Sequence, residues 1–475
     1  MKGWKKMKSS RLKKIACAVC GLLLTACVVL SVAPAAFAEN EPEPFSRSAK
    51  EFVSGITAGW NLGNTFEACD LWGNWPEDNN DLSPTDAETN WNNPVTTQEM
   101  FDKVAEYGFN AVRIPVTWYK FTNVDENGTY TIRQEWIDRV KEVVSYAQKH
   151  DMYVIVNMHH DDKNWLDIAA TGEEWDAMVD RYSQVWTIIA DAFKDYDEKL
   201  ILEAGNEMIG NDDWWGHEDY YFEHQNQLYQ KFYEIVRNSG GNNDKRYLML
   251  PTYGAQWYSH QFEKVWFPEN DDHMICDIHW YTDTTEEEYR TYFGAIANYF
   301  ANTDVAPMMG ECGIGKNVST GQKVRWARNY FGIAGEYGLK CFIWDDGGDM
   351  QVLNRRTLEW VSERMILAIM ETVGVDIDPS TTTTTTATTV TTAISTSTST
   401  TVTTASTTQN ILGDANGDGK VTVSDVMEVR KYVAELIGDD ELDMTAADVN
   451  KDGKVTVSDV MRVRMYVAEL IDTFE

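Results

Sequence analysis

Two carboxylates in this chain each follow a short apolar run. Glu207 closes the run that begins at Leu200, and Glu311 closes the run that begins at Ala306. A pair of carboxyl groups can cleave a glycosidic bond, because one can act as the acid/base while the other acts as the nucleophile. This chemistry requires both groups at the same end of a set of strands, so the order of the predicted elements decides whether it is possible.

Eight short apolar runs with polar or aromatic ends are predicted to be strands: residues 59–63, 111–116, 153–159, 200–207, 246–253, 274–281, 306–312 and 340–345. Amphipathic stretches separate most of them; in residues 136–149, one helical face carries Ile137, Val140, Val143, Val144 and Ala147. Eight alternating units over roughly 330 residues predict a (β/α)₈ barrel with its site at the C-terminal strand ends. The alternative, an open doubly wound sheet, requires a Gly-rich phosphate loop that residues 59–64 do not form.

The N-terminus has the features of a secretory signal peptide. Seven Lys and Arg residues among the first 14 precede an apolar stretch, residues 15–32, and then Ala36-Phe37-Ala38. We therefore expect a signal peptide over residues 1–38, cleavage before Glu39 and a secreted, extracellular protein. Residues 24–27, ending in Cys27, also resemble a lipoprotein cleavage box, but the residues after Cys27 stay apolar, as within a signal core. No later stretch is apolar enough to span a bilayer, so we expect no membrane association after cleavage.

The charge of the chain limits its partners. The formal net charge is −34, and removal of the signal peptide leaves 34 basic against 75 acidic residues, a net charge of −41. Nucleic acid and anionic membranes are therefore poor partners, whereas a neutral polymer or a cation is a good one. Of the four cysteines outside the signal, Cys276, Cys312 and Cys341 fall on consecutive predicted strands, which favours buried free thiols. The sequence leaves open whether any pair of these, or Cys69, is bonded.

The composition after Asp378 divides the chain. Residues 39–378 are predicted to form the catalytic domain, residues 379–409 a disordered Thr/Ser linker, and residues 410–475 a small all-α domain. A 12-residue motif recurs in the last segment with an offset of 34 residues, and each copy has the oxygen ligands and central glycine of an EF-hand-type calcium loop. The predicted ligands of two Ca²⁺ ions are Asp414, Asn416, Asp418 and Asp425 in the first loop, and Asp448, Asn450, Asp452 and Asp459 in the second.

Each calcium loop runs into an amphipathic helix, with Val426 and Val429 on the apolar face of the first and Val460 and Val463 on that of the second. A unit of about 60 residues has a small core and needs metal ions to stabilise it. These duplicated loop-and-helix units resemble a type I dockerin. The resemblance implies binding to a cohesin module of a scaffoldin, as in cellulosomes.

The predicted strand ends resemble glycoside hydrolase family 5, most closely its subfamily 4, which is dominated by endo-β-1,4-glucanases. The matching motifs are residues 59–65 (GWNLGNT), 113–118 (RIPVTW), 157–160 (NMHH), 202–207 (LEAGNE), 279–281 (HWY), 310–313 (GECG) and 343–347 (IWDDG). The resemblance implies a secreted, retaining endo-β-1,4-glucanase on a cellulosome scaffold that needs no cofactor for catalysis. The same machinery could act instead on xyloglucan, mixed-linkage β-glucan, xylan or mannan.

The resemblance also assigns roles to individual residues. Glu207 is the expected acid/base with a raised pKa, and Glu311 is the expected nucleophile, kept ionised by Arg113 and Tyr281. A retaining mechanism places the two carboxyl groups about 5 Å apart. The expected substrate-binding residues are Arg113, His159, Asn206, His279, Tyr281 and Trp344, with Asn206 holding the sugar 2-hydroxyl and Trp344 forming a stacking floor.

Two alternative functions, a metal-dependent enzyme and a non-catalytic protein, each predict a different set of residues at the site. A catalytic metal would need two histidines on one strand face, whereas adjacent residues such as His159 and His160 are expected to point in opposite directions. A non-catalytic carbohydrate-binding or assembly component would lack Glu207 or Glu311, and both are present. Several of the 18 tryptophans fall in predicted loops, where flat rings can line a glycan cleft: Trp72, Trp75, Trp91, Trp165, Trp214, Trp215 and Trp257.

Overall fold

The computed structural model describes residues 43–68, 82–377, 412–416, 420–433, 442–451 and 453–456, together with 459, 460, 462, 463, 466 and 474. The chain divides at Thr384 into two compact units, which are described separately. The predicted signal peptide, the linker, Cys69, Trp72 and Trp75 lie outside the described residues. Within the described part of the chain, no helix is both long and apolar enough to cross a membrane.

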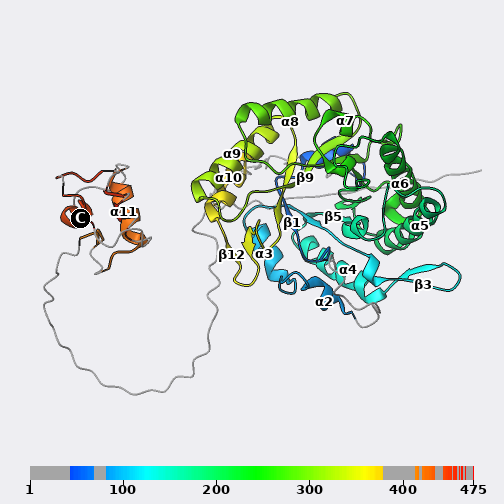
Figure 1. Ribbon diagram of the computed structural model, residues 1–475, viewed down its shortest axis with the longest axis horizontal. Helices are drawn as coiled ribbons and strands as arrows, with labels where there is room; N and C mark the ends of the chain where they lie inside the picture. Colours follow the sequence, from blue (N-terminus) through cyan, green and yellow to red (C-terminus); the bar gives the residue numbers. More distant parts are fainter. Residues whose placement is uncertain are drawn as a thin grey trace, which may run out of the picture. The chain divides into compact units, whose positions relative to one another are not determined.

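The first unit is a closed barrel of eight parallel strands, as the sequence predicts, with a ring of helices around it (Figure 1). Neighbouring strands follow the order of the chain, and β10 pairs with β1 to close the barrel. The strands are β1 (Gly59–Leu62), β2 (Ala111–Ile114), β5 (Tyr153–Asn157), β6 (Leu200–Glu203), β7 (Leu248–Pro251), β8 (Met274–His279), β9 (Ala306–Cys312) and β10 (Lys340–Asp345). Because all strands run the same way, their C-terminal ends meet at one end of the barrel.

The helices outside the barrel bury one apolar face each. In α4, the predicted face Ile137, Val140, Val143, Val144 and Ala147 is buried. The helices of this unit are α1 (Ala49–Ser54), α2 (Pro84–Glu88), α3 (Gln98–Glu106), α4 (Gln134–Gln148), α5 (Glu173–Phe193), α6 (Asp219–Asn238), α7 (Ser259–Phe262), α8 (Glu286–Phe300), α9 (Thr320–Glu336) and α10 (Glu363–Thr372). Two antiparallel hairpins, β3 (Thr122–Val124) with β4 (Tyr130–Ile132) and β11 (Leu353–Asn354) with β12 (Glu359–Trp360), extend the connections.

Several strands end earlier than their apolar runs predict. The fourth barrel strand, β6, stops at Glu203, so Glu207 lies in the loop beyond it and not on the strand. The last ladder bond is donated by the Ala204 N–H to the Met249 carbonyl, at 3.0 Å. The Ala204 carbonyl accepts instead from the side-chain hydroxyl of Tyr182, at 2.8 Å, and the ladder ends there. The chain then turns with Asn206 and Glu207 into the barrel mouth.

A short N-terminal helix closes the other end of the barrel. Helix α1 begins at a capping box in which Ser48 and Glu51 each bond the backbone N–H of the other. Its Phe52 is fully buried and stacks on Tyr247, with ring centroids 3.6 Å apart, and meets the edge of Tyr153 at 4.9 Å. These rings join the inward side chains at the N-terminal strand ends in one buried cluster. The cluster separates that end of the barrel from solvent.

The second unit has helices α11 (Val423–Val433) and α12 (Met444–Ala447) and a small core. The core includes Val426, Val429, Val460 and Val463, which confirms the apolar faces predicted for the two repeats at these positions. The aromatic ring of Phe474 stacks on Tyr466, with centroids 4.6 Å apart, and adds to this core. So small a core gives little hydrophobic stabilisation of its own.

We predict that Phe52→Ala destabilises the barrel by about 3–5 kcal/mol, because the substitution leaves a cavity between two aromatic rings. Tryptophan fluorescence during urea unfolding measures this change for the barrel alone, since residues 412–475 contain no tryptophan. Val124→Ala is the control, because Val124 is 56% exposed at the hairpin and its loss is expected to cost no more than about 0.5 kcal/mol. Equal losses in the two variants would contradict the role of α1.

Candidate active site

Arg113 lies at the centre of the barrel mouth, fully buried on β2. Its Nε and Nη2 donate to the two carboxylate oxygens of Glu203, at 2.7 and 2.9 Å, in a bidentate ion pair. Its Nη1 donates to Glu311 Oε1 at 2.6 Å, and its Nη2 also donates to the side-chain oxygen of Asn206 at 2.9 Å. One guanidinium therefore fixes three side chains that come from β6, the loop after it and β9.

Glu311 is held as an acceptor. Besides the bond from Arg113, its Oε2 accepts the hydroxyl proton of Tyr281 at 2.6 Å. Burial raises the pKa of Glu311, although the charges of His279 and Arg113 oppose the shift. Two donors aimed at one carboxylate stabilise its ionised form and orient its oxygens.

Glu207 is joined to His279 on β8. The ring Nδ1 of His279 lies 2.8 Å from Glu207 Oε1 and 3.5 Å from Glu311 Oε2. Its Nε2 lies 2.9 Å from Asp277 Oδ2. An oxygen of Glu207 and an oxygen of Glu311 are within 4.8 Å of one another, and both face this histidine. The two carboxyl groups are thus close enough to act on one bond.

The pKa of Glu207 differs from the raised value that its expected role predicts. Burial favours a raised pKa, but the hydrogen bond and charge of His279 outweigh burial and lower the pKa of Glu207 in this ligand-free site. Burial also opposes protonation of His279, yet Glu311 and Asp277 raise the pKa of His279 well above its ordinary value. These opposite shifts favour the carboxylate form of Glu207 and the imidazolium form of His279.

The remaining predicted residues gather at the same mouth. His159 is buried beside Trp344, with ring centroids 5.9 Å apart and planes 10° from parallel. Trp344 is half-buried on β10 and packs on Gly63, where a Cβ would lie 2.7 Å from the indole ring. Glycine at position 63 therefore lets the ring lie flat at the end of β1.

Three further polar residues of the mouth were not among the predicted site residues: Asn61, Glu203 and Asp277. All three are fully buried inside the barrel. Asn61 accepts from Arg113 Nη1 at 3.2 Å and donates to the carbonyl of Gly310 at 2.9 Å. The sequence did contain a signal for these residues, because each is a charged or amide residue within an otherwise apolar predicted strand. Asp277 also lies two positions before His279, so both side chains are on the same face of their strand.

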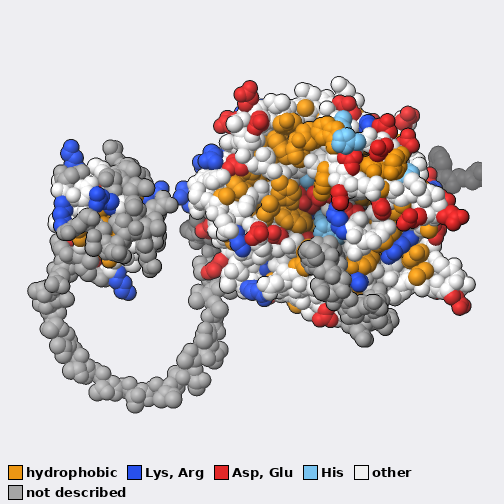
Figure 2. All heavy atoms as spheres, viewed as in Figure 1, with side chains coloured by type: hydrophobic (Ala, Val, Ile, Leu, Met, Phe, Trp, Pro, Cys, Tyr) orange, Lys and Arg blue, Asp and Glu red, His pale blue; other side chains and the backbone are white. Residues whose placement is uncertain are grey.

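Exposed tryptophans lie on the loop after β6, beside half-buried aromatic residues on the loop after β7. Trp214 and Trp215 are 44% and 47% exposed, and Trp215 packs on Tyr258 with centroids 5.1 Å apart. The Lys163 ammonium lies 5.6 Å from the centroid of Trp214. Trp91, by contrast, packs on His160 at 5.8 Å. Figure 2 shows hydrophobic side chains and histidines gathered in the middle of this face, with acidic side chains around them.

The two adjacent histidines do not point in opposite directions, so that expectation is wrong. Strand β5 ends at Asn157, and the short 3₁₀ helix His160–Lys163 follows, which brings the rings of His159 and His160 to 4.4 Å. Among the described residues, neither belongs to a cluster of three potential metal ligands. Glu207, His279 and Glu311 do form such a cluster, but each ring nitrogen of His279 already lies within 2.9 Å of a carboxylate oxygen, from Glu207 or Asp277.

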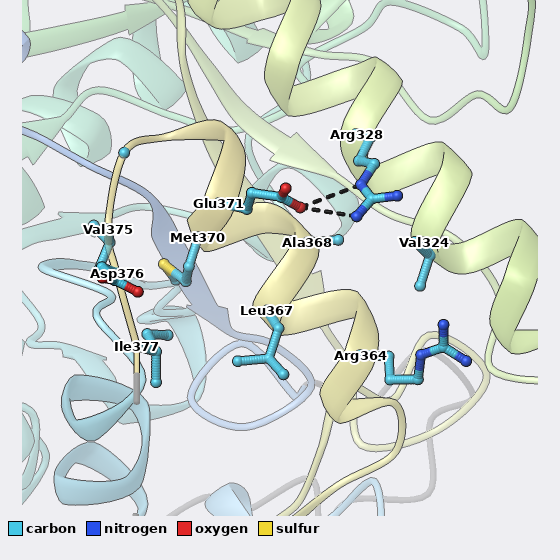
Figure 3. A pocket seen from close by; sticks show the side chains of 11 residues that line it. Val324, Arg328, Arg364, Leu367, Ala368, Met370, Glu371, Val375, Asp376 and Ile377 are labelled. Atoms are coloured by element: carbon cyan, nitrogen blue, oxygen red, sulfur yellow. Dashed lines mark hydrogen bonds and ion pairs between the residues drawn. The ribbon is translucent and has the colours of Figure 1, made fainter. Parts of the chain in front are cut away.

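A hollow of about 580 Å³ on the outside of the barrel unit is a separate feature (Figure 3). It lies between α9, α10 and the segment after α10, and Arg328 and Glu371 form an ion pair of 2.9 Å at its edge. Its lining residues include none of the polar residues of the barrel mouth. The convergent chemistry is therefore at the mouth and not in this hollow.

The second unit presents buried carboxylates at the position-12 ligands of both calcium loops. Asp425 is fully buried and accepts from the backbone N–H groups of Asn416, at 3.1 Å, and Thr422, at 2.7 Å. Asp459 repeats this arrangement with Asn450 and Thr456, at 3.2 and 2.9 Å. Asp414 is buried, Asp448 accepts from the Gly453 N–H at 2.8 Å, and Asp418 and Asp452 lie outside the described residues. Two buried carboxylates among oxygen donors fit a hard cation such as Ca²⁺.

An eight-stranded parallel barrel whose C-terminal end holds two neighbouring carboxyl groups has the arrangement of a glycosidase. The model of the family described as Cellulase (glycosyl hydrolase family 5) matches residues 75–349, and that of the Dockerin type I domain matches residues 412–468. The chain therefore belongs to glycoside hydrolase family 5 and carries a type I dockerin, which confirms both resemblances.

Individual relatives agree with this assignment. The Cellulase/esterase CelE of Acetivibrio thermocellus is 35% identical over 415 residues, which are 81% of this chain and 47% of that protein, so the chain spans about half the length of this relative. Endoglucanase A of Clostridium longisporum is 33% identical over 74% of this chain and 71% of its own length. A solved structure, a GH5-4 broad specificity endoglucanase from Ruminococcus champanellensis with bound cellotriose, is 32% identical with a TM-score of 0.64. The match covers 69% of this chain and 100% of that one.

A buried carboxyl beside the mouth gives a pH-dependent prediction. Glu67 is fully buried after β1 and accepts from the backbone N–H groups of Asn64 and Thr65. Burial raises the pKa of Glu67 from 4.5 to about 7. The folded state therefore binds this proton more tightly than the unfolded state, and the associated stability is present below about pH 4.5 and is lost as the pH rises to about 7.

We expect the free energy of unfolding to fall more between pH 5 and 7 in the wild type than in Glu67→Gln. The difference between the two falls is expected to be up to roughly 3 kcal/mol. Urea unfolding at several pH values, followed by tryptophan fluorescence, measures both slopes. Asp161 and Asp162, whose pKa values burial raises to about 6 and about 7, are present in both proteins and cancel in the comparison. Parallel slopes would show that Glu67 is ionised throughout.

Proposed function

We propose that this chain is a secreted, retaining endo-β-1,4-glucanase that hydrolyses internal β-1,4-glucosidic bonds and attaches to a cohesin-bearing scaffold through its dockerin. The observation that carries the proposal is the pair formed by Glu207 and Glu311, whose oxygens lie within 4.8 Å at the barrel mouth. Retaining enzymes hold their carboxyl groups about 5–5.5 Å apart, whereas inverting enzymes leave room for a water molecule between them.

The two carboxylates take different roles because their partners differ. Arg113 and Tyr281 donate to Glu311, which suits a nucleophile that must be ionised. Among the described residues, Glu207 pairs with His279 and with no guanidinium, so it can exchange a proton with the imidazole, which suits the acid/base. Asn206, held by Arg113, is placed to bind the sugar 2-hydroxyl, and Trp344 offers the ring on which the sugar stacks.

The reaction proceeds in two displacements. In the first, an oxygen of Glu311 bonds to the anomeric carbon while the bond from that carbon to the glycosidic oxygen breaks. The electron pair stays on the leaving oxygen, which takes a proton from Glu207. In the second, Glu207 takes a proton from water, and the water oxygen displaces Glu311 from the anomeric carbon.

The substrate is a β-1,4-linked glucan. Xyloglucan, mixed-linkage β-glucan, xylan and mannan are alternative substrates for the same mechanism, and the relative from Ruminococcus champanellensis is described as a broad specificity endoglucanase. The exposed rings of Trp214 and Trp215 offer flat surfaces for pyranose rings beyond the cleaved bond. A neutral polymer also suits a chain of net charge −34, which would repel a polyanion.

We expect Glu207→Gln and Glu311→Gln each to lower the rate at which reducing sugar is released by roughly 10²- to 10⁴-fold on every substrate tested. The reason is that each substitution removes one of the two carboxyl groups of the double displacement. The assay uses carboxymethylcellulose, xyloglucan, lichenan, xylan and mannan. A lead by carboxymethylcellulose or another glucan supports the glucanase proposal, whereas a lead by xylan or mannan overturns its substrate.

Azide separates the two roles. With an activated aryl β-cellobioside, Glu207→Ala is expected to yield the β-cellobiosyl azide, and Glu311→Ala the α-cellobiosyl azide, because azide replaces water in the first case and the nucleophile in the second. Both products are distinguished by proton NMR. Interchanged products would interchange the roles. Full activity in either variant would overturn the assigned site, whereas an inactive wild type would favour the non-catalytic alternative.

The dockerin supplies the scaffold contact. Two Ca²⁺ ions held by the Asp425 and Asp459 loops would order the small second unit, since its core alone is too small to do so. We expect chelation with EGTA to abolish binding to a type I cohesin, measured by calorimetry, and to leave carboxymethylcellulose hydrolysis unchanged. The double variant Asp425→Ala, Asp459→Ala is expected to reproduce this effect with calcium present. Loss of hydrolysis on chelation would contradict the independence of the two units.

A further inference from the structure

Asp277 is a buried carboxylate directly behind His279. Both residues lie on β8 two positions apart, so their side chains enter the barrel on the same face. Asp277 is fully buried, and its Oδ2 lies 2.9 Å from His279 Nε2. The imidazole thus stands between two carboxylates, Asp277 on one nitrogen and Glu207 on the other.

The fold accommodates the Asp277 carboxylate in a tightly packed position that leaves one of its oxygens poorly hydrogen-bonded. A Cβ at Gly310 of β9 would lie 2.0 Å from Asp277 Oδ1, so the carboxylate occupies space that a side chain at position 310 would fill. Among the described residues, that Oδ1 is buried without a hydrogen-bond partner at normal geometry, while the guanidinium of Arg113 is 4.0 Å from Oδ2 and the Glu203 carboxyl also acts on Asp277. A buried oxygen without a partner is unfavourable, so packing alone does not explain Asp277.

A structural carboxylate in the same barrel looks different. Asp345, at the end of β10, is equally buried and accepts hydrogen bonds from the Trp60 indole and from the backbone N–H groups of Gly347, Val352 and Leu353. These bonds hold a loop in place. The bond that Asp277 makes to His279 instead fixes a titratable ring next to the reacting groups.

We propose that Asp277 is a positioning residue that, by accepting the Nε2–H of His279, directs the Nδ1–H at Glu207, so that His279 stores the proton used by the leaving group. The inference rests on the acid/base role proposed for Glu207. A neutral imidazole donates from one nitrogen only, whereas carboxylates at both nitrogens are satisfied together by the imidazolium.

The proton transfer balances without any further reactant. As a glycosidic oxygen reaches Glu207, the Nδ1 proton of His279 moves to Glu207 Oε1, and the imidazole becomes neutral while still donating its Nε2–H to Asp277. Glu207 then passes a proton to the leaving oxygen as the bond to the anomeric carbon breaks. The water proton taken up by Glu207 in the second displacement returns to His279 and restores the starting state.

Other titratable groups also face His279 or the carboxylates beside it. They are Glu311 and Tyr281, Arg113 and Glu203 in the barrel mouth, and His159, His160 and Lys163 at and after the end of β5. All of them remain when Asp277 is changed. A difference caused by Asp277 therefore reports the contacts of Asp277 itself, of which the bond to His279 at 2.9 Å is shorter than the Arg113 contact at 4.0 Å.

The test compares Asp277→Asn with Asp345→Asn in the full chain without its signal peptide. For Asp277→Asn, kcat/KM on carboxymethylcellulose is expected to fall at least about tenfold at pH 7, and the alkaline limb of its pH profile to move down by about one unit, because an anion beside the stored proton is lost. With 2,4-dinitrophenyl β-cellobioside, whose leaving group needs no proton, the loss is expected to stay below about threefold. Asp345→Asn is expected to leave the alkaline limb at its wild-type position.

An unshifted alkaline limb in Asp277→Asn, or equal losses on the two substrates, would overturn the proposal. Glu311→Gln in the same assay tests the proposed function separately. Activity of Glu311→Gln on either substrate would overturn the proposed function and not only the role of Asp277. If Asp277→Asn does not fold, ¹⁵N-histidine NMR of His273→Gln protein decides. One imidazole protonated on both nitrogens is expected above pH 8, since His273 is another histidine whose carboxylate neighbours raise its pKa. The lack of such a signal would overturn the proposal.

Discussion

The ion pairs of Arg113 are the interaction on which the rest of the site depends. Four carboxyl groups, those of Glu203, Asp277, Glu207 and Glu311, converge at the barrel mouth, where burial makes their mutual repulsion costly. Arg113 contacts Glu203 and Glu311 directly, and protonated His279 lies between the other two. The shortest contacts of each cation are therefore with a different pair of carboxyl groups, and two longer contacts, Arg113 to Asp277 at 4.0 Å and His279 to Glu311 at 3.5 Å, link the pairs.

The parallel barrel makes this arrangement possible with few residues. Strands that run the same way bring side chains from β2, β6, β8 and β9 to one end, although these strands are up to about 200 residues apart in the chain. The segment from Glu203 to Glu207 serves twice, because its first residue anchors Arg113 and its last contacts His279. At the opposite end, Phe52 and Tyr247 exclude water, so the charged mouth faces an apolar base.

The eight strands and the residues at their ends could be predicted from the sequence, because the periodicity of apolar residues and the alternation of strands with helices along the chain are typical of a parallel barrel. The sequence could not predict where the strands stop, since the end of β6 depends on a hydrogen bond from Tyr182, 22 residues earlier in the chain. The expectation for His159 and His160 was wrong for the same reason, as it extended strand geometry past Asn157. Asp277 was missed because its significance lies in contacts with β9 and His279, which no local pattern contains.

The pKa of Glu207 shows which charges matter in such a protein. The net charge of −34 suggests that every site proton should be held tightly, which would favour a raised pKa at Glu207. However, charges on the surface are screened within about 8–10 Å at ordinary ionic strength, whereas His279 lies 2.8 Å from Glu207 inside the protein. This one short contact with a buried cation therefore outweighs the many surface anions. A substrate that displaces water from the mouth changes these few short contacts and leaves the surface charge as it was, so the proton can move to Glu207 only when the bond to be cleaved is in place.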